Sequence, residues 1–219
     1  MLSQLIEMVR WSLKIDITAQ LAKHSDIRKI VDIHISAFPE FFLTSLGPKF
    51  LHGYYCSVNE KNNGEIIIAK DGAGQIVGFA AYVFDAQDFY RRLGRQKIGL
   101  GMAALTYVLL KPSFVVKIFS RILALRSRTK AESYGGFELV SIGVSPLCSG
   151  KGVGNQLLLS VIGAISRHGG GTLSLRTDIT NNDYVISFYE KNGFHVKSID
   201  EIGKRKMYVM QRSVDKFYG

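Results

Sequence analysis

The 219-residue sequence is poor in cysteine, proline and tryptophan, with two, four and one residue of each type. Cys56 and Cys148 lie far apart in the chain, which argues against a disulfide framework or a metal site and favours a reducing, cytoplasmic compartment. The uncharged run at residues 98–110 is too short to cross a bilayer, which takes about 20 residues. Residues 1–14 lack the features of a secretory signal. We therefore expect an amphipathic leader at 1–14 and one domain at 15–211.

Acidic residues are absent from residues 89–131, although ten of the 28 Lys and Arg residues lie there. The other 18 basic residues equal the 18 acidic ones, so the net charge of +10 belongs to this segment. From Pro112 onward the apolar residues share one helical face, which is typical of a basic helix on an anionic membrane surface. A pocket wall for an anionic acceptor and a homodimer interface are the open alternatives. We find no nucleic-acid recognition module in the sequence.

Residues 138–155, ELVSIGVSPLCSGKGVGN, carry the clearest pattern in the chain. The apolar run at 139–144 predicts a strand, a glycine-rich turn follows, and apolar residues recur at helical spacing from Val153. Such a turn leaves several backbone N–H groups unpaired at the positive end of a helix. The pattern therefore predicts a site for a phosphate or pyrophosphate group.

The glycine turn fits neither of the two common nucleotide-binding patterns. A P-loop requires glycine where Ser145 stands and Ser or Thr where Gly152 stands, and the dinucleotide pattern fails at Asn155. The turn instead resembles the acetyl-CoA pyrophosphate loop of the GNAT acyltransferases, Gln/Arg-x-x-Gly-x-Gly/Ala. Here that loop reads SGKGVG at 149–154, with Ser149 in place of Gln or Arg.

A second stretch strengthens this resemblance. Residues 182–194, NDYVISFYEKNGF, resemble the Asn, helix and Phe-Tyr-Glu-Lys-x-Gly-Phe motif that follows the pyrophosphate loop in the GNAT family. A strand candidate at 172–177 lies between the two motifs. The resemblance covers roughly residues 15–210. It implies an α/β GNAT fold, with a mixed sheet splayed between its fourth and fifth strands and the basic helical insertion, at about 89–131, between its third and fourth.

The resemblance also implies acetyl-CoA as the co-substrate, with no metal. Backbone groups of the fourth strand would face the thioester and pantetheine, the glycine turn would hold the pyrophosphate, and Asn182 would bond the pantetheine arm or cap its helix. The implied cofactor-binding residues are Ile142, Gly143, Val144, Ser149, Gly150, Lys151, Gly152, Val153, Gly154, Asn155, Asn182 and Tyr189.

Two side chains are the implied catalytic groups. Tyr189 would protonate the departing CoA thiolate, because a phenol with an ordinary pKa of about 10 matches a thiol leaving group; the alternative is a core aromatic. Glu138 matches a position where many relatives place a general base that acts through water, and a solvated strand-end carboxylate is the alternative. His34 and Asp85 are weaker candidates for the base. Some family members need none, because the amine can lose its proton to bulk water.

The remaining elements follow from local patterns. Residues 15–19 alternate like a strand, Ser25 and Asp26 precede a helix that Pro39 ends, and runs at 65–70 and 75–84 flank a turn, which is a hairpin signature. A further helix is expected at 48–58. By resemblance the two helices wall the acceptor pocket, so the aromatic loop at 38–47 is expected to face the acceptor.

Three functions are compatible with these patterns. The first is an N-acetyltransferase acting on a small or sugar-linked amine, such as an amino sugar in cell-surface polysaccharide synthesis. The second is a protein or peptide N-acetyltransferase, and the third is a non-catalytic CoA-binding module docked at a membrane. The first gives a cytoplasmic enzyme, peripheral at the inner face of the membrane if the basic segment binds lipid.

Overall fold

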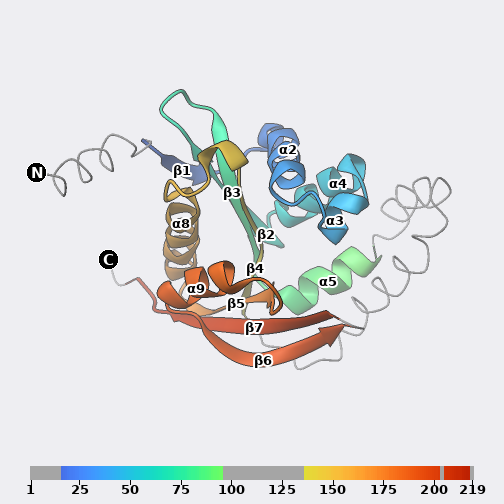
Figure 1. The fold of residues 1–219 in the computed structure, drawn as a ribbon, viewed down its shortest axis with the longest axis vertical. Coiled ribbons are helices and arrows are strands. Elements are labelled where there is room, and N and C mark those ends of the chain that lie inside the picture. The colour runs from blue at the N-terminus through green and yellow to red at the C-terminus, as the bar shows by residue number, and fades with distance from the viewer. Residues whose placement is uncertain (1–15, 96–135, 203–204, 218–219) are drawn as a thin grey trace, which may run out of the picture.

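The computed structural model of the chain describes residues 16–95, 136–202 and 205–217 (Figure 1). The expected leader at 1–14, the uncharged run at 98–110 and the amphipathic helix from Pro112 lie outside the described residues.

The first half of the described chain supplies three strands and most of the helices. In chain order these are β1 (Thr18–Leu21), η1 (His24–Asp26), α2 (Ile27–Ala37), α3 (Phe42–Ser45), α4 (Pro48–Val58), β2 (Gly64–Lys70), β3 (Ile76–Val83) and α5 (Ala86–Arg95). The hairpin of β2 and β3 is confirmed, as is α4, whose first residue is a proline that needs no N–H partner there. The strand expected at 15–19 is displaced and runs from Thr18 to Leu21.

The start and end of α2 differ in detail from the expectation. Asp26 does not cap α2 with its side chain; its Oδ2 accepts a hydrogen bond from the Lys23 backbone N–H at 2.8 Å, within the turn of η1. The helix ends at Ala37, because Pro39 disfavours the helical conformation at Phe38. The loop that follows is not wholly irregular, since it contains α3.

The second half supplies the rest of the sheet and two long helices. These elements are β4 (Phe137–Val144), η3 (Pro146–Cys148), α8 (Val153–Arg167), β5 (Gly171–Asp178), α9 (Asp183–Lys191), β6 (His195–Ile202) and β7 (Arg205–Val214). The strand, glycine turn and helix predicted at 138–155 are present. β7 continues to Val214, beyond the expected domain limit at residue 211.

The seven strands form one mixed sheet in the order β1-β2-β3-β4-β5-β7-β6. Every neighbouring pair is antiparallel except β4 and β5. These two parallel strands pair only from Phe137 opposite Leu173 to Leu139 opposite Leu175, although each is eight residues long. The sheet is thus splayed between its fourth and fifth strands, as the resemblance predicted.

A β-bulge in β4 lies where this splay begins. Tyr82 of β3 pairs with Leu139 and the adjacent Ala81 pairs with Ser141, so Val140 is one residue in excess. Val140 packs against the core beneath α2 and α4, and the Ser141 hydroxyl contacts Tyr55 of α4. Two consecutive side chains therefore face the same side of the sheet, which regular alternation forbids. The bulge turns Ser141 toward α2 and α4.

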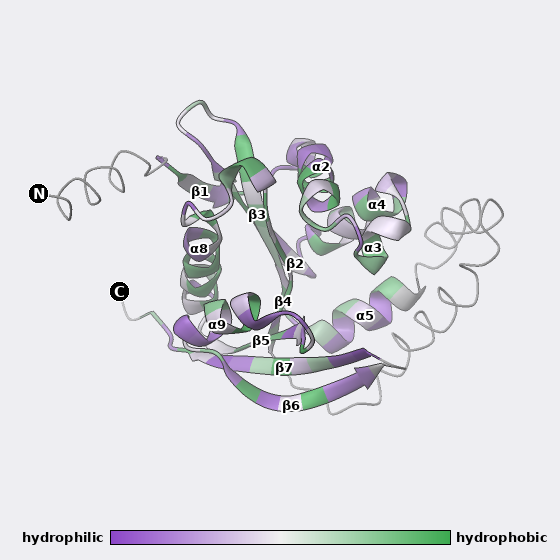
Figure 2. Cartoon of the chain, viewed as in Figure 1, coloured by the Kyte–Doolittle hydropathy of each residue, from purple (hydrophilic) through white to green (hydrophobic). Residues whose placement is uncertain are grey.

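Two hydrophobic cores cover the two faces of the sheet. α8 and α9 cover one face, with Leu157, Leu158 and Tyr189 among the buried residues, and α2 and α4 cover the other, with Ile30 and Leu51. In β6 and β7, short stretches of hydrophilic and hydrophobic residues follow one another along the strands (Figure 2).

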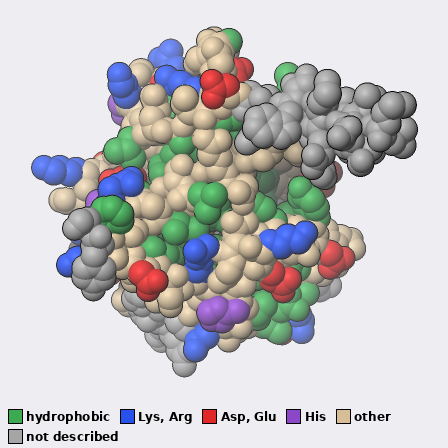
Figure 3. All heavy atoms as spheres, turned by 90° about the vertical axis from the view of Figure 1, so that its left-hand side faces the viewer, with side chains coloured by type: hydrophobic (Ala, Val, Ile, Leu, Met, Phe, Trp, Pro, Cys, Tyr) green, Lys and Arg blue, Asp and Glu red, His purple; other side chains and the backbone are tan. Residues whose placement is uncertain are grey.

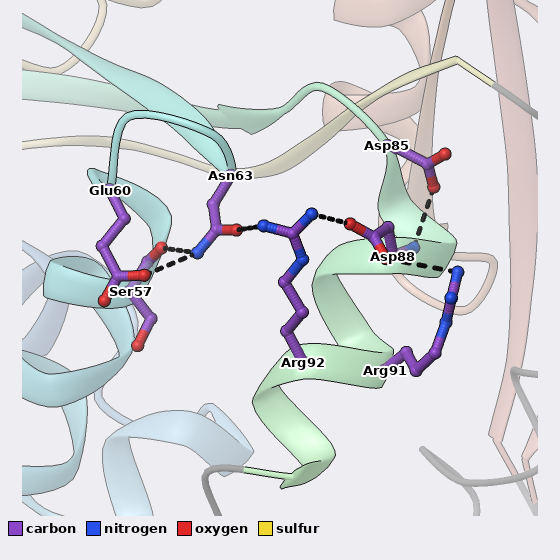
Figure 4. Close-up of polar contacts among 7 residues, drawn as sticks. All are labelled: Ser57, Glu60, Asn63, Asp85, Asp88, Arg91 and Arg92. Carbon is purple, nitrogen blue, oxygen red and sulfur yellow. Dashed lines mark hydrogen bonds and ion pairs between the residues drawn. The ribbon is translucent and has the colours of Figure 1, made fainter.

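The basic segment expected at 89–131 begins inside α5, which belongs to the domain. Phe89 is only 2% exposed, in the core beneath α2 and α4. Arg92 donates to Asn63 at 3.3 Å and pairs with Asp88, which also pairs with Arg91 at 3.2 Å (Figure 4). The first two cations of the segment, Arg91 and Arg92, therefore have partners within the domain. On the side seen in Figure 3, acidic and basic side chains are scattered among apolar ones. This agrees with equal numbers of acidic and basic residues outside residues 89–131.

Candidate active site

A cavity of about 740 Å³ lies where β4 and β5 part. Side chains of α2, the α3 loop, α4 and α5 line one part of it, and the glycine turn and the starts of α8 and α9 line another. The expected site residues in its lining are Glu138, Ile142, Val144, Ser149, Gly150, Gly152, Val153, Gly154, Asn155, Asn182 and Tyr189. Gly143 and Lys151 are outside the lining.

The glycine turn adopts a conformation that only glycine tolerates well. Gly150 and Gly152 have φ values of 74° and 82°, in the left-handed region. Gly152 is the N-cap of α8 and has no capping side chain, so no side chain of the described residues caps the first N–H groups of the helix. The turn thus presents backbone donors and the positive end of the helix dipole to the cavity, an arrangement that suits an anion.

Beyond Leu139, the edge of β4 on the β5 side has no strand partner in the described part of the chain. Ser141, Ile142 and Val144 line the cavity along this edge, where backbone groups are free to bond a ligand. Gly143 faces the same side of the sheet as Ser141, toward Phe79 and Phe38, whereas Ile142 and Val144 face the opposite side. A Cβ at that position would lie 2.9 Å from Phe79 Cε1 and 3.1 Å from Phe38 Cε2.

Tyr189 lies on the buried face of α9, 7% exposed, between Phe188 and Phe194. It lines the cavity, and its hydroxyl has no hydrogen-bond partner among the described residues. Burial raises its pKa above the ordinary value of about 10. Burial thus places the pKa of Tyr189 above the ordinary phenol value from which its role was predicted, and the phenol stays protonated throughout the physiological pH range.

Of the two roles left open for Asn182 by the sequence, the structure does not bear out the capping of α9 by its side chain, and the bond to the pantetheine arm stays a prediction. Its Nδ2 donates to Thr177 Oγ1 at 2.7 Å and to the Asp178 carbonyl at 2.8 Å, so the side chain ties the start of α9 to the end of β5. It makes no capping hydrogen bond to α9. Its Oδ1, in a residue that lines the cavity, remains available to accept a hydrogen bond.

Glu138 is not a solvated carboxylate. It is 4% exposed, with Oε2 2.9 Å from Arg176 Nη1 and Oε1 accepting from the Tyr90 hydroxyl at 3.2 Å. Arg176 also bonds Asp200, at 2.7 Å from Nε. Burial alone would lower the pKa of Arg176, but the attraction of Glu138 and the hydrogen bond to Asp200 outweigh it and raise that pKa. The four side chains form a satisfied polar network at the cavity wall.

Of the two weaker candidates for the base, only His34 lines the cavity. Asp85 is outside the cavity lining, and its Oδ1 caps α5 by accepting from the Asp88 backbone N–H at 2.8 Å. His34 lines the cavity and is 1% exposed, with Nδ1 2.6 Å from the Tyr55 hydroxyl. Its Nε2 has no hydrogen-bond partner among the described residues, and burial lowers the pKa of the ring to about 4.

The aromatic loop expected to face the acceptor does line the cavity. Its contributions come from either side of Pro39, and residues of α4 and α5 extend the same apolar wall. The lining residues are Phe38, Phe41, Phe42, Leu43, Phe50, Tyr54, Tyr90 and Leu93. The acceptor role itself stays a prediction.

Several polar residues of the cavity were missed from the sequence. Arg176 and Asp178 on β5 and Arg205 on β7 line it, with Arg205 paired to Asp178 and 5.4 Å from the centre of the Phe41 ring. The sequence did hold one signal for Arg176, a charged residue inside the strand expected at 172–177. Its partner could not be identified from the sequence, because Glu138 lies on another strand. Within residues 16–95, 136–202 and 205–217, no group of His, Cys, Asp and Glu side chains could hold a metal ion.

Comparison with known proteins agrees with this geometry. A sequence profile of the acetyltransferase (GNAT) family matches residues 27–194. A Corynebacterium glutamicum protein described as histone acetyltransferase HPA2 and related acetyltransferase covers 93% of this chain and 98% of its own, at 20% identity and a TM-score of 0.57. No curated protein sequence matches the chain.

Two other solved structures show the same fold. One is the ribosomal-protein-S18-alanine N-acetyltransferase of Escherichia coli, at 15% identity and a TM-score of 0.56, with 93% of this chain and 96% of that one covered. A Salmonella typhimurium protein solved with its cofactor acetyl-CoA has 16% identity, a TM-score of 0.56 and the same coverage. In the described part of the chain no helix has the length and apolar character needed to cross a membrane.

Proposed function

Because the chain belongs to the acetyltransferase (GNAT) family, we propose that it transfers the acetyl group of acetyl-CoA to the primary amine of a small acceptor. One observation carries the proposal: a single cavity is lined by the glycine turn, the unpaired edge of β4 and Tyr189. A phosphate-binding turn, a strand edge and a proton donor are the three parts that an acyl-CoA substrate needs in one place.

The cofactor would lie along the splay. Its pyrophosphate would accept hydrogen bonds from the backbone of Gly150, Gly152, Val153, Gly154 and Asn155, with the Ser149 hydroxyl beside them and the exposed Lys151 approaching the phosphates from solvent. The pantetheine arm would pair with the backbone of β4 from Ile142 through Gly143 to Val144, as an added strand does. Asn182 Oδ1 would accept from one of its amides.

The reaction makes one C–N bond and breaks one C–S bond. The amine nitrogen attacks the thioester carbonyl, and the tetrahedral intermediate expels CoA as its thiolate. Tyr189 donates a hydrogen bond and then its proton to that sulfur, and is reprotonated from solvent. The raised pKa of Tyr189 keeps the phenol protonated and able to donate a hydrogen bond to the sulfur, although it also makes the phenol a weaker acid than a free one.

The amine must lose one proton, and we assign its acceptance to Glu138, acting through a water molecule. Glu138 lines the cavity on β4, three residues before Ser141, and Arg176 holds its carboxylate in place. Direct loss of the proton to bulk water is the alternative. Replacement of Glu138 by Gln distinguishes the two routes. If Glu138 is the base, the substitution slows transfer at neutral pH and leaves acetyl-CoA binding intact, whereas it leaves the rate unchanged if the proton goes directly to bulk water.

The acceptor would carry its amine on a body with an apolar face. The wall of Phe38, Phe41 and Tyr54 supports this, whereas the charges of Arg176, Asp178 and Arg205 suit polar groups elsewhere on the acceptor. An amino sugar linked to a nucleotide or lipid fits these requirements, since one face of a sugar ring is apolar. A cytoplasmic location agrees with the free Cys56 and Cys148.

The test is CoA release from acetyl-CoA, followed with a thiol reagent, on pools of amino-sugar nucleotides, small amines and peptides. Each pool is run with and without vesicles containing anionic lipid, and the chain is sized by gel filtration for a homodimer. Release with the small-amine or amino-sugar pool supports the proposal. Release only with peptides would make the chain a peptide acetyltransferase, and absence of acetyl-CoA binding would overturn the assignment.

A further inference from the structure

We propose that His34 binds the acceptor amine through Nε2, and that Tyr55 and Ser141 hold the imidazole in position for it. The inference rests on the acetyltransferase function proposed above and adds the group that recognises the nucleophile. Three side chains from three elements carry it: His34 from α2, Tyr55 from α4 and Ser141 from β4.

The first observation is a buried polar atom that no protein group satisfies. His34 is 1% exposed, and its Nε2 has no hydrogen-bond partner among the described residues. A buried, unsatisfied polar group is uncommon in folded proteins and destabilises them. Two of the rings around His34, Phe38 at 5.1 Å and Phe41 at 6.3 Å between centroids, line the same cavity and carry no hydrogen-bonding group. The Tyr55 ring, at 5.7 Å, has its hydroxyl at the other ring nitrogen, Nδ1. A ligand in the cavity is therefore the natural partner.

The second observation is that the other ring nitrogen is fixed. Tyr55 Oη lies 2.6 Å from His34 Nδ1 and donates to Ser141 Oγ at 3.2 Å. In the proposed arrangement the one proton of Tyr55 goes to Ser141, and Nδ1 of His34 donates its proton to the Tyr55 oxygen. Nε2 then carries a lone pair, which is what a primary amine N–H requires of its partner.

The third observation is the charge of the ring. Burial lowers the pKa of His34 to about 4, so the imidazole is neutral at neutral pH. Burial also raises the pKa of Tyr55, which keeps its hydroxyl protonated and the relay intact. A neutral acceptor at Nε2 can orient an amine through N–H and leave the nitrogen lone pair free to attack.

The position is also right for the reaction. The bulge at Val140 turns Ser141 toward α4, and the next residue, Ile142, belongs to the β4 edge proposed to face the thioester. His34 is therefore joined through Tyr55 to the strand that would hold the acetyl group. A straight β4 would turn Ser141 away from Tyr55 and remove this connection.

A pair of substitutions separates binding from structure. In His34→Asn the side-chain amide can reach Tyr55 from the place of Nδ1 but nothing replaces Nε2, whereas in His34→Gln the longer side chain brings an amide group near the place of Nε2. We expect His34→Asn to raise the acceptor KM about tenfold, the loss of roughly one hydrogen bond, with acetyl-CoA affinity unchanged. His34→Gln should recover most of the loss. His52→Asn, on α4 and outside the cavity lining, is the control.

A binding experiment without acetyl transfer tests the same contact. In ¹⁵N-histidine NMR spectra of the full chain with CoA, we expect phenethylamine or glucosamine to shift the Nε2 signal of His34 and not that of His52. An unchanged acceptor KM in His34→Asn, or equal losses in both His34 variants with a lowered Tm, would overturn the inference while wild-type transfer stands. If the wild type transfers to no amine, the NMR shift still decides the inference, and its absence with both amines overturns it.

Discussion

At the scale of single residues, the site depends on polar groups buried at the open edge of β4. Tyr189 lies between aromatic rings, Glu138 is paired with Arg176, and His34 is held by Tyr55. Each is buried among apolar neighbours, where hydrogen bonds and charges are stronger than in water and unpaired groups more costly. The chemistry of the cavity is thus set by which group has a protein partner and which is left for a ligand.

Replacement of Tyr189 by Phe should lower kcat by about 10²-fold, the lower range for a positioned proton donor. Because the ring and its packing remain, acetyl-CoA affinity and Tm should stay near wild type. Stopped assays of CoA release and calorimetric titration measure the two. An unchanged kcat would show that Tyr189 is not the proton donor.

Replacement of Arg176 by Ala should lower the free energy of unfolding by about 3 kcal/mol, because it leaves Glu138 buried without its counter-charge. The exposed pair of Lys206 and Glu201 is the matched control, since both side chains are about 60% exposed, and Lys206→Ala should change stability far less than Arg176→Ala. Urea denaturation compares the variants. Equal effects would mean that the buried network is not a determinant of stability.

At the scale of elements, the turn before α8 and the bulge in β4 position these residues. The turn could be read from the sequence, because glycines between an apolar run and a helical pattern have few other uses. The bulge at Val140 could not, because nothing in LVSIG marks an excess residue; it arises from pairing with β3. For the same reason the contact between Ser141 and Tyr55 was missed, although the elements that carry both were predicted.

Replacement of Gly152 by Ala should weaken acetyl-CoA binding about tenfold. The residue has a φ of 82°, and an L-residue there costs about 1–2 kcal/mol, which the turn can relieve only by moving its N–H groups. Gly163→Ala is the control: it lies inside α8, where a Cβ would meet only Arg167 Nη1 at 3.7 Å, and it should stabilise the helix by up to about 1 kcal/mol. If Gly152→Ala binds acetyl-CoA like the wild type, the turn does not hold the pyrophosphate.

At the scale of the whole molecule, the splayed sheet brings distant parts of the chain to one cavity. Two motifs, at 149–154 and 182–194, were enough to predict the fold and the elements that meet at the cavity, because both act through backbone conformation and helix position. The acceptor end was predicted only as an aromatic loop. Arg176, Asp178 and Arg205 were missed, because their meaning depends on partners across the sheet. The basic segment from residue 96 to 131 lies outside the described residues, and its membrane, pocket-wall and dimer roles stay predictions.

The central claim is that acetyl-CoA occupies the cavity between β4 and β5. Hydrogen exchange of the full chain, followed by mass spectrometry with and without acetyl-CoA, tests it most directly because it reports both binding and place. We expect slower exchange in peptides covering residues 142–156 and 182–190, and little change in β1 and the hairpin of β2 and β3. Saturable protection confined to those two stretches would support the account. Protection elsewhere, or none at saturating acetyl-CoA, would contradict it.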